Sequence, residues 1–132
     1  LVLTPDSATA HMHLGIALQD LDRLQDAEAS YIRAITLRPD YAECHYYLGT
    51  AYKESGRLDK AEESYRNAIA IRFEFPEAHG NLGNILSEQE KYEEAEASYK
   101  QAIEQKKDLP EIYGSLGNLF QLLNRLDEAE ES

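Results

Sequence analysis

The chain has 132 residues, 42% of them apolar, which is enough to bury the core of one folded domain. Its 25 acidic and 13 basic residues leave a formal net charge of -12. This charge repels phosphate backbones and anionic lipid headgroups, and so argues against nucleic acid and membrane as partners. A single cysteine, Cys44, rules out an internal disulfide bond, and a reduced thiol fits a cytoplasmic location.

A period of 34 residues runs through the whole chain. The dipeptide Leu-Gly marks it, with its glycine at Gly15, Gly49, Gly83 and Gly117. The stretch AEASYIRAI at 27–35 returns as AEESYRNAI at 61–69 and as AEASYKQAI at 95–103, and the last residues, 129–132, read AEES. Self-similarity at a fixed period of this length predicts a stacked array of repeats.

Within each period the apolar residues are three and four positions apart, which is the spacing of an amphipathic helix. In chain order the predicted helices are 8–21, 24–38, 42–55, 58–72, 76–89, 92–106, 110–123 and one that starts at 126. Short polar turns are predicted inside each pair, at 22–23, 56–57, 90–91 and 124–125. Gly56 and Asn124 suit the left-handed residue that commonly ends a helix, whereas Asp22 and Glu90 suit it less well.

The recurring small and aromatic residues predict how the two helices of a pair meet. Gly15 and its equivalents are expected to face Ala27 and its equivalents, so that the helices approach closely. The repeated tyrosines, Tyr31, Tyr65 and Tyr99, are expected to fill the wider part of the gap and to direct their hydroxyls to a polar edge. The repeated stretch therefore has a packing role. Because it contains no nucleophile beside a base, it does not predict an enzyme.

The order of a bulky residue, Leu-Gly, an aromatic residue or Leu, then Ala, Tyr, Ala and Pro over 34 residues resembles the tetratricopeptide repeat. The resemblance implies an all-α, right-handed α-α superhelix of antiparallel helix pairs. Complete repeats are expected at 8–41, 42–75 and 76–109, and a truncated repeat at 110–132. Residues 1–7 are expected to end an upstream repeat, because LVLTPD aligns with ITLRPD at 35–40. We therefore expect an excerpt of one longer, continuous solenoid, with apolar surface exposed at both ends.

In this family the first helices of successive repeats line a concave groove that commonly holds an extended or helical peptide. The candidate partner-binding residues at the matching positions are Met12, His13, Ile16, Tyr46, Tyr47, Thr50, Lys53, Asn81, Asn84 and Asn118. The apolar and aromatic members suit an anchor side chain, and the asparagines suit the backbone groups of an extended peptide. Gly80 and Gly114 are expected to leave room for a ligand. Alternatively, the asparagines are ordinary helix-surface residues and the tyrosines cover the neighbouring repeat.

The resemblance also bears on the charge of the partner. Family members that grip a C-terminal carboxylate use a clamp of Lys, Arg and Asn, whereas the matching positions here are Met12, Ile16, Tyr47, Glu77 and Asn81. Only the last of these is suitable, and Lys53 is the single basic groove candidate. A neutral or basic protein segment is therefore expected in preference to an acidic one.

The function that the resemblance implies is a non-catalytic scaffold that binds a peptide or helix of a partner protein in the groove, with no cofactor. One alternative is the substrate-recognition arm of a larger enzyme such as a glycosyltransferase. It arises because NLGN at 81–84 resembles the amide-rich repeats of O-linked N-acetylglucosamine transferases, and of many bacterial repeat proteins. Another alternative is a module that assembles end to end with copies of itself.

Histidines recur once per repeat, at His11, His45 and His79. On neighbouring repeats they should lie about 10 Å apart, roughly a helix diameter, which is too far to share one metal ion. We expect them to pack in the position of the family's bulky residue, and we expect no metal site. Phe73 and Phe75 are expected either to pack into a junction between repeats or to form an exposed edge for a partner.

Overall fold

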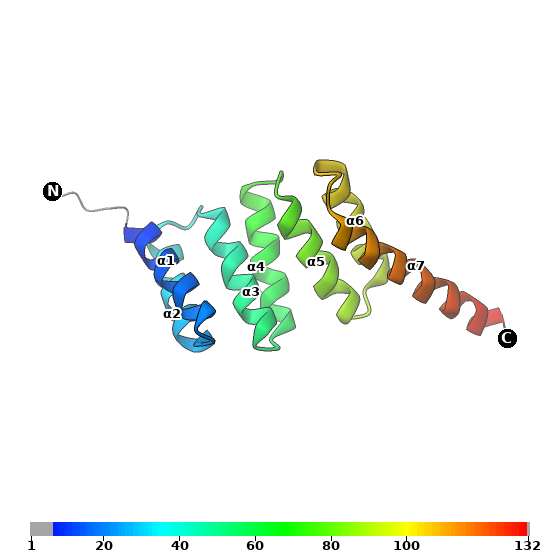
Figure 1. Ribbon diagram of the computed structural model, residues 1–132, viewed down its shortest axis with the longest axis horizontal. Helices are drawn as coiled ribbons and strands as arrows, with labels where there is room; N and C mark the ends of the chain where they lie inside the picture. The colour runs from blue at the N-terminus through cyan, green and yellow to red at the C-terminus, as the bar shows by residue number, and fades with distance from the viewer. Residues whose placement is uncertain (1–6, 132) are drawn as a thin grey trace. The chain divides into compact units, whose positions relative to one another are not determined.

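The structure is a computed structural model that describes residues 7–131, with side chains described through residue 126. Within this range the chain forms helices and no strand (Figure 1). The helices are α1 (Ser7–Asp20), α2 (Leu24–Leu37), α3 (Ala42–Glu54), α4 (Leu58–Ile71), α5 (Pro76–Glu88), α6 (Tyr92–Gln105) and α7 (Pro110–Glu131). The expected all-α class is confirmed, and the first six predicted helices agree with the observed ones to within one residue at each end. The expected end of an upstream repeat falls, apart from Ser7, outside the described residues.

The chain divides into two compact units, Leu1–Phe73 and Glu74–Ser132. In the first unit α1 packs against α2, α2 against α3, and α3 against α4. In the second unit α5 packs against α6 and α6 against α7, with a lighter contact between α5 and α7. Each helix pair therefore buries its apolar stripe against its partner within its own unit.

A tyrosine ring lies against a glycine in each of the three complete helix pairs. A Cβ atom added to Gly15 would lie 2.5 Å from Cε1 of Tyr31, and one added to Gly83 would lie 2.6 Å from Cε1 of Tyr99. Gly49 has the same relation to Tyr65. The atoms nearest to these glycines thus belong to the tyrosine rings rather than to Ala27 and its equivalents. The missing side chain makes room for the flat face of a buried ring.

The turns inside the helix pairs all pass through a residue with positive φ. Asp22 (φ 61), Gly56 (φ 81) and Glu90 (φ 63) occupy this left-handed position. At the first turn the backbone N–H of Arg23 donates to the carbonyl of Leu18 at 2.9 Å, and the same pattern recurs at the other two turns. We expected aspartate and glutamate to suit this position less well than glycine or asparagine, but Asp22 and Glu90 occupy it nevertheless. The closed hydrogen bonds offset a backbone cost of about 1–2 kcal/mol for a residue other than glycine.

The helix pair expected after residue 110 does not form. We predicted a turn at 124–125 and a new helix from 126, but α7 runs without a break from Pro110 to Glu131. In the complete pairs a tyrosine ring holds the second helix against the first, whereas no atom lies within 4 Å of a Cβ built at Gly117. Residues 118–131 contain no glycine or proline. No residue in this stretch breaks a helix, so the chain continues as helix to Glu131.

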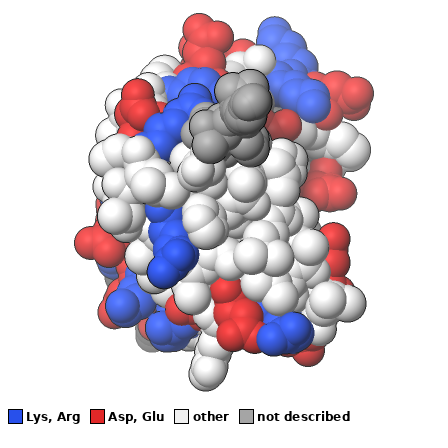
Figure 2. All heavy atoms as spheres, turned by 90° about the vertical axis from the view of Figure 1, so that its left-hand side faces the viewer, with Lys and Arg blue, Asp and Glu red and all other residues white. Residues whose placement is uncertain are grey.

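Helices α1 and α2 carry exposed apolar side chains. Leu14 is 50% exposed, although Leu48 and Leu82, which hold the same repeat position, are buried. Leu21 and Leu37 are exposed as well. Figure 2 views the molecule from the side where α1 and α2 lie, and shows an uncharged area with charged side chains along its border. The expected apolar surface is present on these two helices.

The contact between glycine and tyrosine generates a prediction about stability. Gly83→Ala should lower the free energy of unfolding by about 1–3 kcal/mol, because its Cβ collides with the ring of Tyr99. In the matched change Gly117→Ala the added Cβ meets open space. This change should raise the free energy of unfolding by up to about 1 kcal/mol, because alanine has the higher helix propensity. Urea unfolding followed by helical circular dichroism measures both. Equal effects of the two substitutions would contradict this account of the contact.

Candidate functional site

Four tyrosines of the first unit form a continuous aromatic cluster, which we call the tyrosine cluster: Tyr31, Tyr46, Tyr47 and Tyr65. Tyr47 stacks on Tyr31, with ring centroids 6.2 Å apart and planes 13° from parallel. Tyr46 meets Tyr47 edge to face at 5.4 Å, and lies tilted against Tyr65 at 5.8 Å. The rings of Tyr31 and Tyr65 are buried, whereas those of Tyr46 and Tyr47 are half-buried. Two rings at the surface thus rest on two rings of the core.

The hydroxyls of the two buried rings are tied to the first helices of the pairs. The Tyr31 hydroxyl donates to Oε1 of Gln19 at 2.7 Å, and Nε2 of Gln19 donates in turn to Oε2 of Glu54 at 3.1 Å. The Tyr65 hydroxyl lies 2.9 Å from Oγ1 of Thr50, which donates to the carbonyl of Tyr46 at 3.2 Å. The expectation that the repeated tyrosines reach a polar edge is confirmed.

Burial sets the acid–base behaviour of these groups. It raises the pKa values of the Tyr31 and Tyr65 hydroxyls, and the nearby carboxylate of Glu54 raises both further. Burial also raises the pKa of the Cys44 thiol to about 12, and its sulfur contacts the Tyr31 carbonyl at 3.5 Å. All three groups therefore remain protonated near neutral pH and serve as hydrogen-bond donors.

The other candidates of the first unit differ in how much surface they offer. Met12 is only 7% exposed, so it belongs to the core more than to a binding surface. His13 is exposed, and Ile16 and Lys53 are half-buried. Thr50 is half-buried and already engaged by Tyr65, as described above. Tyr46 and Tyr47 are the aromatic rings that these candidates leave partly accessible.

The candidates of the second unit divide in the same way. Asn84 accepts a hydrogen bond of 2.6 Å from the Tyr99 hydroxyl, so its amide supports the helix pair. Asn81 is half-buried and Asn118 is exposed. The expectation that Gly80 leaves room for a ligand is wrong, because a Cβ there would lie 2.5 Å from Cδ1 of Ile112. At Gly114 nothing lies within 4 Å of the Cβ position, so that part of the expectation agrees with the structure.

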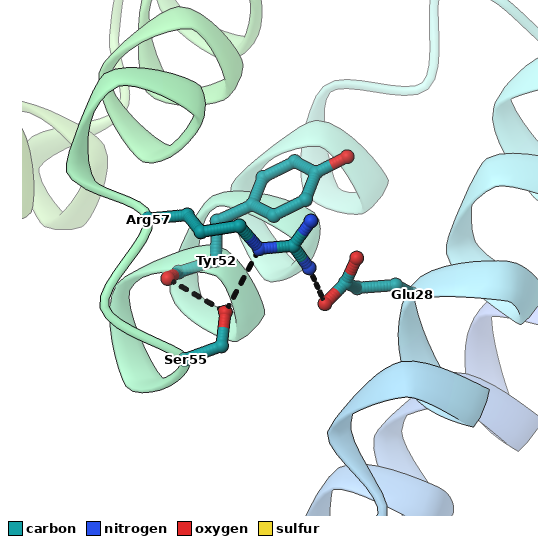
Figure 3. Close-up of polar contacts among 4 residues, drawn as sticks. All are labelled: Glu28, Tyr52, Ser55 and Arg57. Atoms are coloured by element: carbon teal, nitrogen blue, oxygen red, sulfur yellow. Dashed lines mark hydrogen bonds and ion pairs between the residues drawn. The ribbon is translucent and has the colours of Figure 1, made fainter.

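A polar cluster that the sequence analysis missed joins α2 to the end of α3. The Arg57 guanidinium forms an ion pair with the largely buried carboxylate of Glu28, and lies over the ring of Tyr52 at 4.8 Å (Figure 3). Its Nε atom also lies 3.4 Å from Oγ of Ser55. The sequence carried one signal for this ion pair, which is a glutamate and a basic residue 29 positions apart. The same spacing separates Glu43 from Arg72, and these two are paired at 3.0 Å.

Most of the remaining residues that the sequence analysis singled out are buried in the core. His45 and His79 are buried, and Nε2 of His45 lies 2.9 Å from the carbonyl of Pro39, which agrees with the packing interpretation. Phe75 is buried whereas Phe73 is 57% exposed. Among the residues that the structure describes, no three His, Cys, Asp or Glu side chains could hold a metal ion.

None of the described helices combines the length and the apolar character needed to cross a bilayer.

Two family profiles match the chain. A family profile described as "Tetratricopeptide repeat" matches residues 6–72, and one described as "TPR repeat" matches residues 83–124. No curated protein sequence matches the chain.

Several solved structures share the fold at low sequence identity. The first TPR of Spaghetti (RPAP3), solved bound to the HSP90 peptide SRMEEVD, has a TM-score of 0.89 and 19% identity over 92% of this chain and 97% of that one. MamA has a TM-score of 0.86 and 24% identity over 96% of this chain and 74% of that one. The Sgt2 TPR domain from Aspergillus fumigatus has a TM-score of 0.85 and 21% identity over 98% and 84%. At these identities the likeness concerns the fold.

The ion pair between Glu28 and Arg57 is testable by a double-mutant cycle. Glu28→Ala and Arg57→Ala should each destabilise the first unit, and their coupling should be about 1 kcal/mol, because the carboxylate is buried although the arginine is 44% exposed. The exposed pair of Arg23 and Asp26 is the control, with an expected coupling of about 0.2–0.5 kcal/mol. Urea unfolding supplies the four free energies of each cycle. A coupling no larger than that of the control pair would show that the cluster does not join the two helices.

Proposed function

The chain belongs to the tetratricopeptide repeat family, and we propose that it is a non-catalytic scaffold that binds a peptide or helix of a partner protein on the first helices of its pairs. The observation that carries the proposal is the pair of half-buried rings of Tyr46 and Tyr47, supported from below by two buried tyrosines. Aromatic side chains already held in one orientation lose little entropy when a partner covers them. That RPAP3 was solved with a bound peptide supports a peptide as the class of partner.

The second unit offers polar groups of its own. An asparagine amide has two donor hydrogens and an acceptor oxygen with two lone pairs. Asn118, and Asn81 in addition to the interaction that it already has within the chain, can therefore bind unpaired backbone groups of an extended peptide whatever its side chains. Asn84 is assigned a supporting role, because Tyr99 already uses its oxygen. The same side chains would also suit the substrate-recognition arm of a larger enzyme such as a glycosyltransferase. That function stays the alternative proposal.

The proposal is tested by selecting binders from a displayed library of random dodecapeptides with the intact chain as bait. The double substitution Asn81→Ala with Asn118→Ala should weaken the selected peptides about tenfold, which corresponds to two lost hydrogen bonds. The helical circular dichroism and the melting temperature should stay nearly unchanged.

Asn67→Ala is the matched control, because Asn67 is an exposed asparagine on the second helix of a pair. Its substitution should leave peptide affinity as it was. Failure to select any peptide would contradict the proposed function. An equal loss of affinity and of stability in the double variant would instead assign the asparagines to the fold.

Self-association is a second candidate function, favoured by exposed aromatic side chains on α7. Tyr113 is 48% exposed and Phe120 is 45% exposed, whereas the residues at the same repeat positions in α3, His45 and Tyr52, are buried. We propose that α7 of one copy stacks on the exposed apolar side chains of α1 and α2 of a second copy, which bear Leu14.

This candidate predicts that the sedimentation coefficient rises with protein concentration. Either Leu14→Glu or Phe120→Glu should abolish the rise, because each places a charge in the apolar contact. Arg33→Ala, a change at an exposed residue, should leave the rise of the sedimentation coefficient unchanged. A chain that stays monomeric at high concentration would exclude self-association.

A further inference from the structure

We propose that Tyr47, together with the carboxylates of Asp20 and Glu54 near the hydroxyl of the neighbouring Tyr31, forms a position that binds one arginine or lysine side chain of the partner. This inference rests on the proposed function and deepens it, because it names the chemical class of the residue that the tyrosine cluster recognises. The cation would lie over the exposed part of the Tyr47 ring, within the field of the two carboxylates.

The orientation of the Tyr47 ring is the first observation. One face stacks on buried Tyr31 at 6.2 Å, and the half-exposed ring of Tyr46 meets Tyr47 at 69°. Contacts on two sides hold the ring in one rotamer, while its half-exposed state leaves part of its surface to solvent. The negative face of a fixed tyrosine ring attracts a cation within about 6 Å of its centroid.

The charges around the cluster are the second observation. Asp20 and Glu54 both act on the buried hydroxyl of Tyr31, whose pKa they help to raise, and Glu54 also raises that of Tyr65. Both carboxylate side chains belong to exposed residues, and Glu54 is held in place by the amide of Gln19 at 3.1 Å. Two carboxylates at the edge of one aromatic cluster favour a cation and repel an acidic peptide. Lys53 follows along α3, so the expected local charge is moderately rather than strongly negative.

The chain's own arginines show the same chemistry at other rings. The Arg38 guanidinium lies over the ring of Tyr41 at 4.2 Å, and that of Arg57 lies over Tyr52 at 4.8 Å. In the second case a carboxylate, Glu28, completes the arrangement of ring, cation and anion (Figure 3). The proposed position has the ring and the anions of this arrangement, and the partner would supply the cation.

The test uses the dodecapeptides selected on the intact chain. They should be enriched in Arg and Lys at one position relative to the unselected library. Tyr47→Leu should weaken the selected peptides on the order of fivefold, whereas Tyr47→Phe, which keeps the aromatic face, should stay within about twofold.

A second variant does not disturb the packing. Asp20→Asn with Glu54→Gln keeps the size of both side chains, and should weaken the same peptides several-fold and flatten the dependence of affinity on salt. Circular dichroism checks that each variant is folded.

The outcomes separate this inference from the proposed function. Selected peptides that show no basic enrichment, or that are indifferent to both variants, overturn the cation position and leave the scaffold function standing. A selection that yields no peptide overturns both.

Discussion

The packing of a tyrosine ring on the backbone of a glycine is the contact on which the helix pairs depend. It brings the two helices together at Gly15, Gly49 and Gly83, where a methyl group would already collide with the ring. The ring also fixes the direction of its own hydroxyl, which reaches the first helix of the pair at Gln19, Thr50 or Asn84. Each contact therefore joins the apolar core to the polar side of a first helix. No atom lies within 4 Å of a Cβ built at Gly117, and α7 runs without a break to Glu131.

This construction explains why the candidate site is rigid. The half-exposed rings of Tyr46 and Tyr47 do not stand free, because each rests on a buried ring that is itself held by a hydrogen bond. The same residue type thus serves two purposes in neighbouring positions. Buried tyrosines join helices, and the tyrosines next to them offer an aromatic surface of fixed orientation. A partner that covers such a surface gains contact area without the entropic cost of ordering it.

Ion pairs add a second kind of link between the helices. Arg57 connects α2 to the end of α3 through Glu28, and Arg72 connects α4 to the start of α3 through Glu43. Burial raises the pKa of Glu43, but its backbone hydrogen bond and Arg72 lower it more, so the net pKa lies below the ordinary value. The stability that this pair contributes is therefore present at neutral pH, and is lost as the pH falls through that lowered value. Despite the strong excess of acidic residues, these two arginines thus tie helices together.

The sequence by itself determined the period, the all-α class and the ends of six helices, because these follow from apolar spacing and local backbone preferences that recur every 34 residues. It also supplied Tyr46 and Tyr47 as candidates, since the resemblance to a known family predicts which positions face a partner. The sequence did not show which of the candidate residues remain accessible after folding. Met12 is buried, Gly80 is covered by Ile112, and Asn84 is engaged by Tyr99, in each case through a residue that only folding brings near. The course of α7 was likewise not predicted, because an asparagine such as Asn124 can end a helix but does not have to, and the chain continues as helix to Glu131.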